Sequence, residues 1–380
     1  MLMVPLLDQG GLERICAMTA KLLTPHCHLT LVVFSTKGMI YDVDGVDMID
    51  LNLGSVPGKA GKAVNLCKRI RAIKKIKRER NIEITYSFGP TANLANVFTR
   101  VKDKIWVGIR GYGALQDKNS MKRLCRRADR VICCSKVMAD DVKTQFGAKD
   151  VVCVYNPCDV ESIRRLAKEP LPAESQKFFD AGAPVVAAMG REHDVKGFWH
   201  LIKAFALAKK KIPALKLMIV GEGTFAEYRK LAEDLQVEQD VWFTGVQKNP
   251  FAYLKQASLF VMTSVSEGFP NSLIEAMAVG IPAMSVNCKT GPAEIFLDDY
   301  RKGGNGHTII EGEYGVLLPV ICPEKNLDAS VFEKEEEIMA EQMVKVLTEP
   351  EKLTERKAAS LKRAEDFSVQ AYTDSLFRMI

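Results

Sequence analysis

Long apolar runs are missing from this sequence, and none approaches the roughly 18 residues that a membrane-spanning helix needs. It also lacks a C-x-x-C pair, and its first residues do not have the composition of a secretory signal. The ten cysteines are instead scattered, several of them inside strand-like segments. We therefore expect reduced, mostly buried thiols in a cytoplasmic protein that does not span a bilayer.

Metal-ligand patterns, nucleic-acid motifs and internal repeats are also absent. The five histidines lack a convincing ligand spacing. Asp42-Val-Asp44 is the only Asp-x-Asp pattern and could hold a divalent ion on a diphosphate, but the neighbouring Gly45 favours a polar turn. Basic residues occur without aromatic interleaving or a recognisable RNA- or DNA-binding motif. We expect no metal site and no nucleic-acid partner.

Segments rich in Val, Ile and Leu alternate with segments of helical composition, which is the rhythm of a parallel sheet. The strands expected in the first half cover residues 2–7, 29–35, 84–88, 105–109, 130–134 and 151–155. Those expected in the second half cover residues 185–189, 216–220, 241–244, 259–263 and 283–286. The sequence therefore predicts an α/β protein with two doubly wound, Rossmann-like domains, 1–160 and 184–366, joined by a Pro-containing linker, 161–183.

The most informative segment runs from Glu267 to Glu275 and carries two carboxylates eight positions apart, with a Gly and a Pro between them. Its composition predicts a strand, a turn and a helix that Asn271 or Ser272 caps, with Glu275 in the first turn. A helix N-terminus can bind an anion, and each carboxylate can accept two hydroxyl hydrogen bonds, which suits a nucleotide sugar. An ordinary strand-to-helix connection with a first-turn Glu is the simpler alternative.

A second loop of this kind begins at Gly190 and ends at Gly197, between a strand-like run and a helical stretch. It places Arg191 and Lys196 at the C-terminal end of a strand, where open α/β sheets bind their ligands. Two fixed cations suit a diphosphate, although an isolated Arg or Lys in a loop is usually solvated. The two loops together predict a nucleotide-sugar site in the second domain.

Several segments together resemble one known family. The Gly190–Gly197 loop, Gly221-Glu222-Gly223 and the Glu267–Glu275 segment are similar to those of the retaining GT-B glycosyltransferases of family 4, of the group 1 type. In the first half, the Gly10-Gly11 loop and the strands and hinge of residues 128–157 resemble the same family. The resemblance covers nearly the whole chain. The paired-Glu segment is its specific part, and the Gly-rich pieces are weak individually.

The resemblance implies two domains that face a central cleft, with the acceptor bound by the first and the nucleotide sugar by the second. A terminal helix, 367–380, would pack back on the first domain. The implied reaction moves a hexose or N-acetylhexosamine from a UDP-sugar to an acceptor hydroxyl with retention of the anomeric configuration. It needs no metal or other cofactor.

Residue roles follow from the same resemblance. Arg191 and Lys196 would neutralise the departing diphosphate and Glu267 would hold hydroxyls of the transferred sugar, which makes these three the catalytic candidates. Glu275 would hold the ribose diol. Further donor contacts would come from Gly11, Gly190, Gly268, Phe269, Asn271 and Ser272.

The loop 108–114 departs from the family, because many relatives place a histidine there and this chain has none. Arg110 or Tyr112 can serve on the acceptor side instead, or the loop can simply shape the acceptor cleft. We assign no general base from the sequence, and front-face attack assisted by the donor phosphate is compatible with that absence.

Positive charge is concentrated in the first part of the chain. Residues 1–160 carry a net charge of +11 and residues 161–380 a net charge of −5. Much of the excess lies in residues 68–80, a basic helical stretch with Ile at every third position along one side. That helix can lie on an anionic membrane surface, or its Ile stripe can pack into the core with the basic side solvated.

No pattern in the sequence identifies the acceptor. A lipid-linked glycan in bacterial surface polysaccharide assembly, at the inner face of the cell membrane, fits the basic first domain. A soluble small-molecule acceptor is also compatible. Two other functions are alternatives: a nucleotide-sugar-binding regulator without turnover, and another GT-B enzyme such as a nucleotide-sugar epimerase.

Overall fold

The computed structural model of this chain describes residues 1–8, 10–179 and 182–380. They form two compact units: unit 1 comprises Met1–Asn156 and Thr373–Ile380, and unit 2 comprises Pro157–Tyr372. The first domain therefore ends slightly before the predicted residue 160. The predicted linker, 161–183, falls in unit 2, and its described residues include helices α6 (Val160–Leu166) and α7 (Ala173–Gln176).

Unit 1 contains a parallel seven-stranded sheet with the strand order β3-β2-β1-β4-β5-β6-β7. Its strands are β1 (Leu2–Val4), β2 (Thr30–Val33), β3 (Asp47–Asp50), β4 (Ile84–Phe88), β5 (Lys104–Ile109), β6 (Arg130–Cys133) and β7 (Val151–Cys153). The order reverses between β1 and β4, which is where such sheets open a ligand crevice. The sequence does not predict β3, because this edge strand has exposed Asp residues at both ends.

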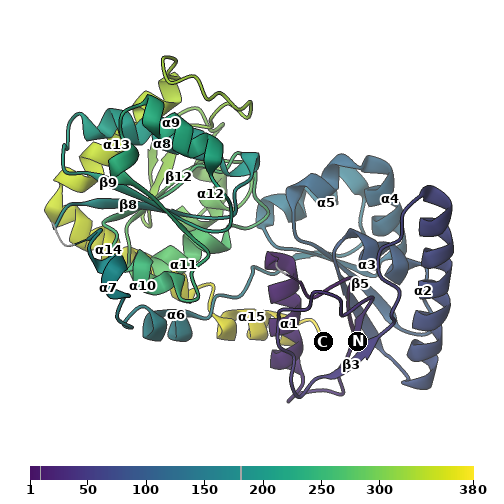
Figure 1. Cartoon of the computed structure of the whole chain (residues 1–380). Helices are drawn as coiled ribbons and strands as arrows, with labels where there is room; N and C mark the ends of the chain where they lie inside the picture. The colour runs from purple at the N-terminus through teal and green to yellow at the C-terminus, as the bar shows by residue number, and fades with distance from the viewer. Residues whose placement is uncertain (9, 180–181) are drawn as a thin grey trace. The chain divides into compact units, whose positions relative to one another are not determined.

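The helices of unit 1 lie on both faces of the sheet (Figure 1). They are α1 (Gly11–Leu23), α2 (Lys59–Glu79), α3 (Pro90–Val97), α4 (Lys118–Arg127) and α5 (Lys136–Phe146), with a 3-10 turn η1 (Tyr112–Gln116). Right-handed crossovers place α1 on one face and α2 to α5 on the other. The terminal helix α15 (Val369–Phe377) ends in unit 1, where the Phe377 ring packs edge-on against His26.

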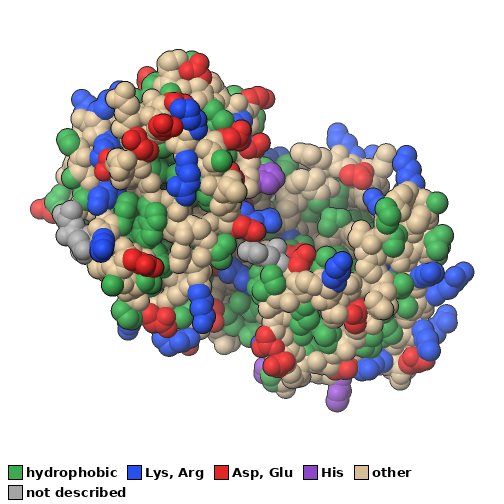
Figure 2. Space-filling model, in the orientation of Figure 1, with side chains coloured by type: hydrophobic (Ala, Val, Ile, Leu, Met, Phe, Trp, Pro, Cys, Tyr) green, Lys and Arg blue, Asp and Glu red, His purple; other side chains and the backbone are tan. Residues whose placement is uncertain are grey.

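Helix α2 contains the basic stretch 68–80, apart from its last residue. Ile73 is fully buried and Ile76 packs against the same core cluster, so these two isoleucines face the core. Arg69 also points inward, and its guanidinium lies 4.5 Å from the centroid of the Phe34 ring. Lys and Arg side chains line the outer edge of α2 (Figure 2). Among the described residues, no helix reaches the length and apolarity that a membrane crossing requires.

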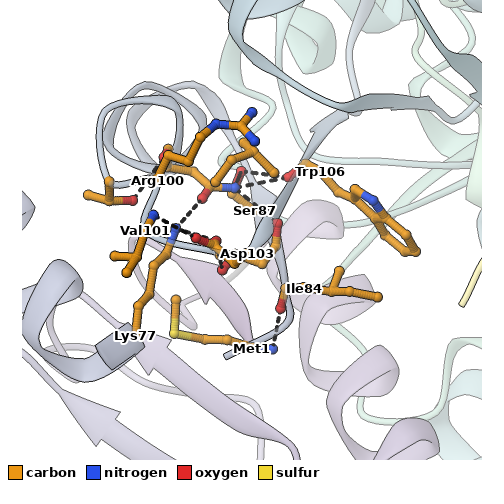
Figure 3. A network of polar contacts seen from close by, with 12 residues as sticks. Met1, Lys77, Ile84, Ser87, Arg100, Val101, Asp103 and Trp106 are labelled. Atoms are coloured by element: carbon orange, nitrogen blue, oxygen red, sulfur yellow. Dashed lines mark hydrogen bonds and ion pairs between the residues drawn. The ribbon is translucent and has the colours of Figure 1, made fainter. Parts of the chain in front are cut away.

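Lys77 on α2 is fully buried in an ion pair. Its Nζ lies 2.7 Å from Asp103 Oδ2 and donates to Asn96 Oδ1 at 3.0 Å (Figure 3). Thr85 Oγ1 donates to the same carboxylate at 2.7 Å. Burial lowers the pKa of Lys77 to about 8, and the hydrogen bond and charge of Asp103 oppose that shift. The pair therefore compensates two charges that would each cost several kcal/mol to bury alone.

Replacing Lys77 with Ala leaves Asp103 buried without its cation, so we expect unit 1 to lose about 3 to 5 kcal/mol of stability. Hydrogen exchange of unit 1 amides at increasing urea concentration measures this loss separately from unit 2. Lys75→Ala is the control, because Lys75 is exposed and lies 3.7 Å from Glu79 in a surface pair. Equal losses in the two variants would show that the buried pair is not the source of the effect.

Unit 2 contains a second seven-stranded sheet, with the order β10-β9-β8-β11-β12-β14-β13. Its strands are β8 (Val185–Met189), β9 (Lys216–Val220), β10 (Val241–Gly245), β11 (Leu259–Met262), β12 (Ala283–Val286), β13 (Ile310–Glu311) and β14 (Val316–Leu318). Only the edge strand β13 is antiparallel within this described sheet. The order reverses between β8 and β11. The sequence does not predict β13 and β14, because these strands are very short.

The helices of unit 2 cover both faces of its sheet, with α8, α9 and α13 on one side and α10, α11 and α14 on the other (Figure 1). Besides α6 and α7, they are α8 (Phe198–Lys209), α9 (Ala226–Asp234), α10 (Pro250–Leu254), α11 (Asn271–Val279), α12 (Pro292–Phe296), α13 (Lys334–Thr348) and α14 (Pro350–Glu365). Pro350 begins a new helix because it cannot continue α13. The prediction of two Rossmann-like α/β domains is confirmed.

Candidate functional site

Two strand-to-helix loops of unit 2 lie side by side where the strand order reverses. The first follows β8 and contains the short 3-10 helix η2 (Asp194–Lys196), and the second follows β11 and leads into α11. Val265 N donates to Val195 O at 2.9 Å, and Thr263 Oγ1 donates to Lys196 O at 2.8 Å. The pairing of the two strands therefore continues into their loops.

Gly197 forms the turn from the first loop into α8. Its φ is +60°, and a Cβ atom at this position would lie 2.3 Å from the carbonyl oxygen of Thr263. A residue with a side chain would suffer both the backbone strain and this contact. Gly197 therefore allows the loop that carries Lys196 to lie directly against the second loop.

Lys196 and Glu267 form an ion pair between the two loops. Lys196 Nζ lies 2.7 Å from Glu267 Oε1, and the side chains are 25% and 14% exposed. The Lys196 side chain runs close to Gly190, where a Cβ atom would lie 3.2 Å from Lys196 Cε. The structure thus brings together three of the predicted residues, Gly190, Lys196 and Glu267. Because the two charged side chains are partly buried, their interaction is stronger than it would be in water.

Helix α11 begins directly after this pair, and its N-cap is Pro270, with no side-chain cap. The prediction that Asn271 or Ser272 caps the helix is wrong, because these are its first two residues. Glu275 is also not in the first turn, which contains no acidic residue. Leu273 N and Ile274 N donate to the Pro270 carbonyl. The positive end of the helix dipole at this N-terminus favours an anionic ligand.

The other predicted residues of this segment differ in exposure. Phe269 and Glu275 are buried, with 5% and 7% of their surface exposed. Gly268, Asn271 and Ser272 are partly exposed. The segment therefore presents its backbone and small polar side chains to solvent, and its aromatic ring to the interior.

A third loop, which the sequence analysis does not single out, supports Glu267. It follows β12, and Thr290 Oγ1 donates to the backbone carbonyl of Glu267. Gly291 has a φ of +99°, and a Cβ atom at this position would lie 2.3 Å from Pro270 Cδ, so only a glycine allows this close approach. Burial raises the pKa of the nearby Cys288 thiol above its usual range, so the thiol stays neutral. The signal in the sequence is the Thr-Gly-Pro turn that begins four residues after the end of a predicted strand.

The loop after β9 fixes the other end of the Lys196 loop. Gly190 N donates to Val220 O at 2.9 Å, and Glu192 N donates to Glu222 O at 2.7 Å. Glu192 Oε2 accepts a hydrogen bond from Phe225 N at 2.8 Å. Arg191 lies between these anchored residues with its side chain exposed.

The remaining predicted residues belong to unit 1, at the C-terminal edge of its sheet. Gly11 is the first residue of α1. Arg110 follows β5 and donates to Asn156 Oδ1 at 2.9 Å and to the Tyr86 hydroxyl. The Tyr112 hydroxyl donates to Asp141 Oδ2 at 2.6 Å. These contacts hold both side chains of the predicted acceptor region in fixed orientations.

The Asp42-Val-Asp44 pattern is engaged within unit 1. Asp42 Oδ2 lies 2.6 Å from Lys21 Nζ, and Asp42 Oδ1 accepts from Asp44 N at 2.8 Å. These contacts are those of a polar turn, with Gly45 at a φ of +81°.

His200, Glu333 and Glu336 place three possible metal-ligand atoms within 4.8 Å of one another. His200 Nδ1 is at hydrogen-bond distance, 2.7 Å, from Glu336 Oε1. Both carboxylates also accept backbone N–H groups in the capping box of α13. The arrangement fastens α8 to the start of α13.

Comparison with known proteins defines the class. The family model for group 1 glycosyl transferases matches residues 173–313, and that for glycosyltransferase family 4 matches residues 9–162. This chain is similar in structure to Anabaena HepE, whose crystal structure contains UDP and glucose, with a TM-score of 0.73 and 16% sequence identity. The superposition covers 100% of this chain and 99% of the HepE chain. The chain therefore has the GT-B fold. The two family models cover different parts of it, and the chain belongs to the group 1 glycosyltransferases.

Two curated relatives are similar over part of the chain. An uncharacterized glycosyltransferase of Methanocaldococcus jannaschii is 33% identical over 221 residues, 57% of this chain and 54% of the relative. N-acetylgalactosamine-N,N'-diacetylbacillosaminyl-diphospho-undecaprenol 4-alpha-N-acetylgalactosaminyltransferase of Campylobacter jejuni is 31% identical over 212 residues, 55% of this chain and 52% of the relative. The chain thus spans about half the length of these relatives.

Gly197→Ala should destabilise unit 2 by more than the cost of a left-handed backbone, about 1 to 2 kcal/mol, because the new methyl group also meets the Thr263 carbonyl. Gly245→Ala is the control, since its φ is +71° and nothing lies within 4 Å of an added Cβ. Urea unfolding can be followed by the fluorescence of Trp199 and Trp242, with Trp106 of unit 1 replaced by Phe throughout. Equal losses in the two variants would contradict the close approach.

Proposed function

We propose that this chain transfers a hexose or an N-acetylhexosamine from a UDP-sugar to an acceptor hydroxyl, with retention of the anomeric configuration and without a metal. The observation that carries the proposal is the Lys196–Glu267 pair, 2.7 Å apart, beside the N-terminus of helix α11. A cation suited to a diphosphate therefore lies next to a carboxylate suited to sugar hydroxyls.

The proposed mechanism is electrostatic stabilisation of the leaving group. As the glycosidic bond stretches, negative charge develops on the departing diphosphate. Lys196 neutralises that charge together with the positive N-terminal end of the α11 dipole, and Arg191 adds a second cation from the exposed side of the same loop. Fixed cations at this place supply the charge that a divalent ion supplies in metal-dependent transferases.

The carboxylates orient the donor. Glu267 accepts hydrogen bonds from hydroxyls of the transferred sugar, and Glu275, one turn into α11, accepts from the ribose diol. Glu267 is suited to this role because its backbone is held by Thr290, so its carboxylate starts from a fixed position.

The proposed acceptor is a lipid-linked glycan in bacterial surface polysaccharide assembly. The name of the Campylobacter jejuni relative describes transfer to a diphospho-undecaprenol-linked sugar. Arg110 and Tyr112, held at the C-terminal edge of the unit 1 sheet, would contact this acceptor. The enzyme would then work in the cytoplasm at the inner face of the cell membrane.

Calorimetric titration of the metal-free protein tests the donor site. We expect UDP to bind in the micromolar range and more tightly than GDP, and Glu275→Ala to weaken that binding at least about tenfold because the ribose loses its partner. Lys196→Ala should lower turnover of the matching UDP-sugar by about 10² to 10³. Glu238→Ala, on the exposed turn η3 (Glu238–Asp240), is the control and should change neither quantity.

Other outcomes of this titration would replace the proposal. Binding that requires a divalent ion would contradict the metal-free mechanism. UDP-sugar binding with neither transfer nor hydrolysis would indicate a regulator, and release of an epimerised free sugar would indicate an epimerase. Full turnover by Lys196→Ala would refute its role at the diphosphate.

Vesicle sedimentation tests whether the basic side of α2 binds an anionic membrane surface. The exposed cations Lys68, Arg71, Lys75 and Arg78 lie along the outer side of α2. Their replacement by Gln should abolish binding to vesicles rich in anionic lipid at low salt, since each cation contributes about 1 kcal/mol. The matched control removes the same charge from α4, at Lys118, Lys122, Arg123 and Arg126, which are also exposed. Equal losses of vesicle binding in the α2 and α4 variants would show that net charge causes the binding. If the wild-type protein does not bind the vesicles, the hypothesis of membrane binding through α2 is refuted.

A further inference from the structure

A segment outside the three site loops contacts the Lys196 loop and helix α8 at several points. This segment, residues 321–336, joins β14 to the first residues of α13 and is called the anchoring segment here. Its Ile321 side chain packs on Gly197, where a Cβ atom would lie 3.3 Å from Ile321 Cδ1. The Cys322 carbonyl lies 2.9 Å from His200 Nε2. The anchoring segment therefore touches the residue directly after Lys196 and the first turn of α8.

Lys325 ties the anchoring segment to the start of η2. Its Nζ lies 3.1 Å from Asp194 Oδ1 and 2.5 Å from Glu227 Oε2, and its side chain is 24% exposed. The same ammonium lies 5.2 Å from the centroid of the Tyr228 ring. One cation therefore connects the Lys196 loop, through Asp194, with helix α9, through Glu227 and Tyr228.

The far end of the anchoring segment fixes α8 through buried groups. His200 Nδ1 lies 2.7 Å from Glu336 Oε1, and both side chains are fully buried, so both ring nitrogens of His200 have partners. One helical turn further along α8, the fully buried Lys203 donates to Val331 O at 2.9 Å. Buried polar groups with partners of this kind orient a helix strongly, because each lost contact would leave a desolvated group.

We infer that the anchoring segment positions the Lys196 ammonium for the diphosphate, with Lys325 and Glu336 as positioning residues on the two sides of Lys196. The ligand in this statement rests on the proposed function, whereas the anchoring itself does not. Lys196 lies in a single 3-10 turn, which has few hydrogen bonds of its own to fix its place. A displacement of about 1 Å at a charge-stabilising group can cost about 100-fold in rate.

Lys325→Ala tests one side of this arrangement. Because Lys325 and its two carboxylate partners are partly exposed, the variant leaves no unpaired buried charge and should fold. We expect faster hydrogen exchange in the peptide 190–198, with a loss of about tenfold in both UDP affinity and kcat/KM for the UDP-sugar. Lys325→Arg should restore all three. Lys345→Ala is the control, because it removes an ion pair with Glu311 of β13 instead.

A double variant separates positioning from a general effect on stability. In a Lys196→Ala background the ammonium to be positioned is gone, so adding Lys325→Ala should not weaken UDP binding further. Independent, additive losses would overturn the inference. Glu336→Gln tests the buried side of the anchoring segment, and we expect it also to speed hydrogen exchange in the peptide 190–198. The new amide oxygen can still accept from the Glu333 backbone, but His200 loses its carboxylate partner.

The exchange measurement separates failure of this inference from failure of the proposed function. Wild-type protein that binds no UDP would refute the proposed function, and the exchange rates of peptide 190–198 would still test the anchoring. Unchanged exchange in both Lys325→Ala and Glu336→Gln would overturn the inference, even if wild-type protein binds UDP and turns over its sugar. Faster exchange confined to these two variants, and absent from Lys345→Ala, would support it.

Discussion

The pairing of β8 with β11 is the constraint on which the site of unit 2 depends. Parallel strands end at the same edge of a sheet, and the order of this sheet sends β9 and β12 to opposite sides of that pair. The loops after β8 and β11 therefore leave the sheet as direct neighbours. Lys196 and Glu267, 71 positions apart in the chain, meet because of this geometry. The loops after β9 and β12 then support them from either side.

Two Lys–carboxylate pairs in the protein have the same chemistry and opposite surroundings. Lys77 and Asp103 are fully buried and share further hydrogen bonds with Asn96 and Thr85, so neither charge can exchange its partner without unfolding part of unit 1. The Lys196–Glu267 pair is partly exposed at the edge of a sheet. Burial thus decides that the first pair is a structural element and that the second remains accessible to a ligand.

Much of the fold and the centre of the site could be predicted from the sequence, because the spacing of apolar residues and the presence of turn residues are local signals. Strands β8, β9 and β12 have the predicted bounds, and the sequence correctly places the loops with Lys196 and Glu267 at strand ends. It does not predict that α11 starts after Pro270, because composition favours Asn271 or Ser272 as the N-cap. The contact between His200 and Glu336 spans 136 positions and depends on helix packing that no local pattern encodes.

The Lys196–Glu267 pair also bears on selectivity at the proposed site. In the structure each group is the counterion of the other, so an anion that approaches the Lys196 ammonium also meets the negative charge of Glu267, whose side chain is only 14% exposed. Under the proposed function, a ligand that carries both an anion and hydroxyl donors would satisfy the ammonium and the carboxylate at once. A small inorganic anion would meet repulsion from the carboxylate instead, so the pair would discriminate against such anions.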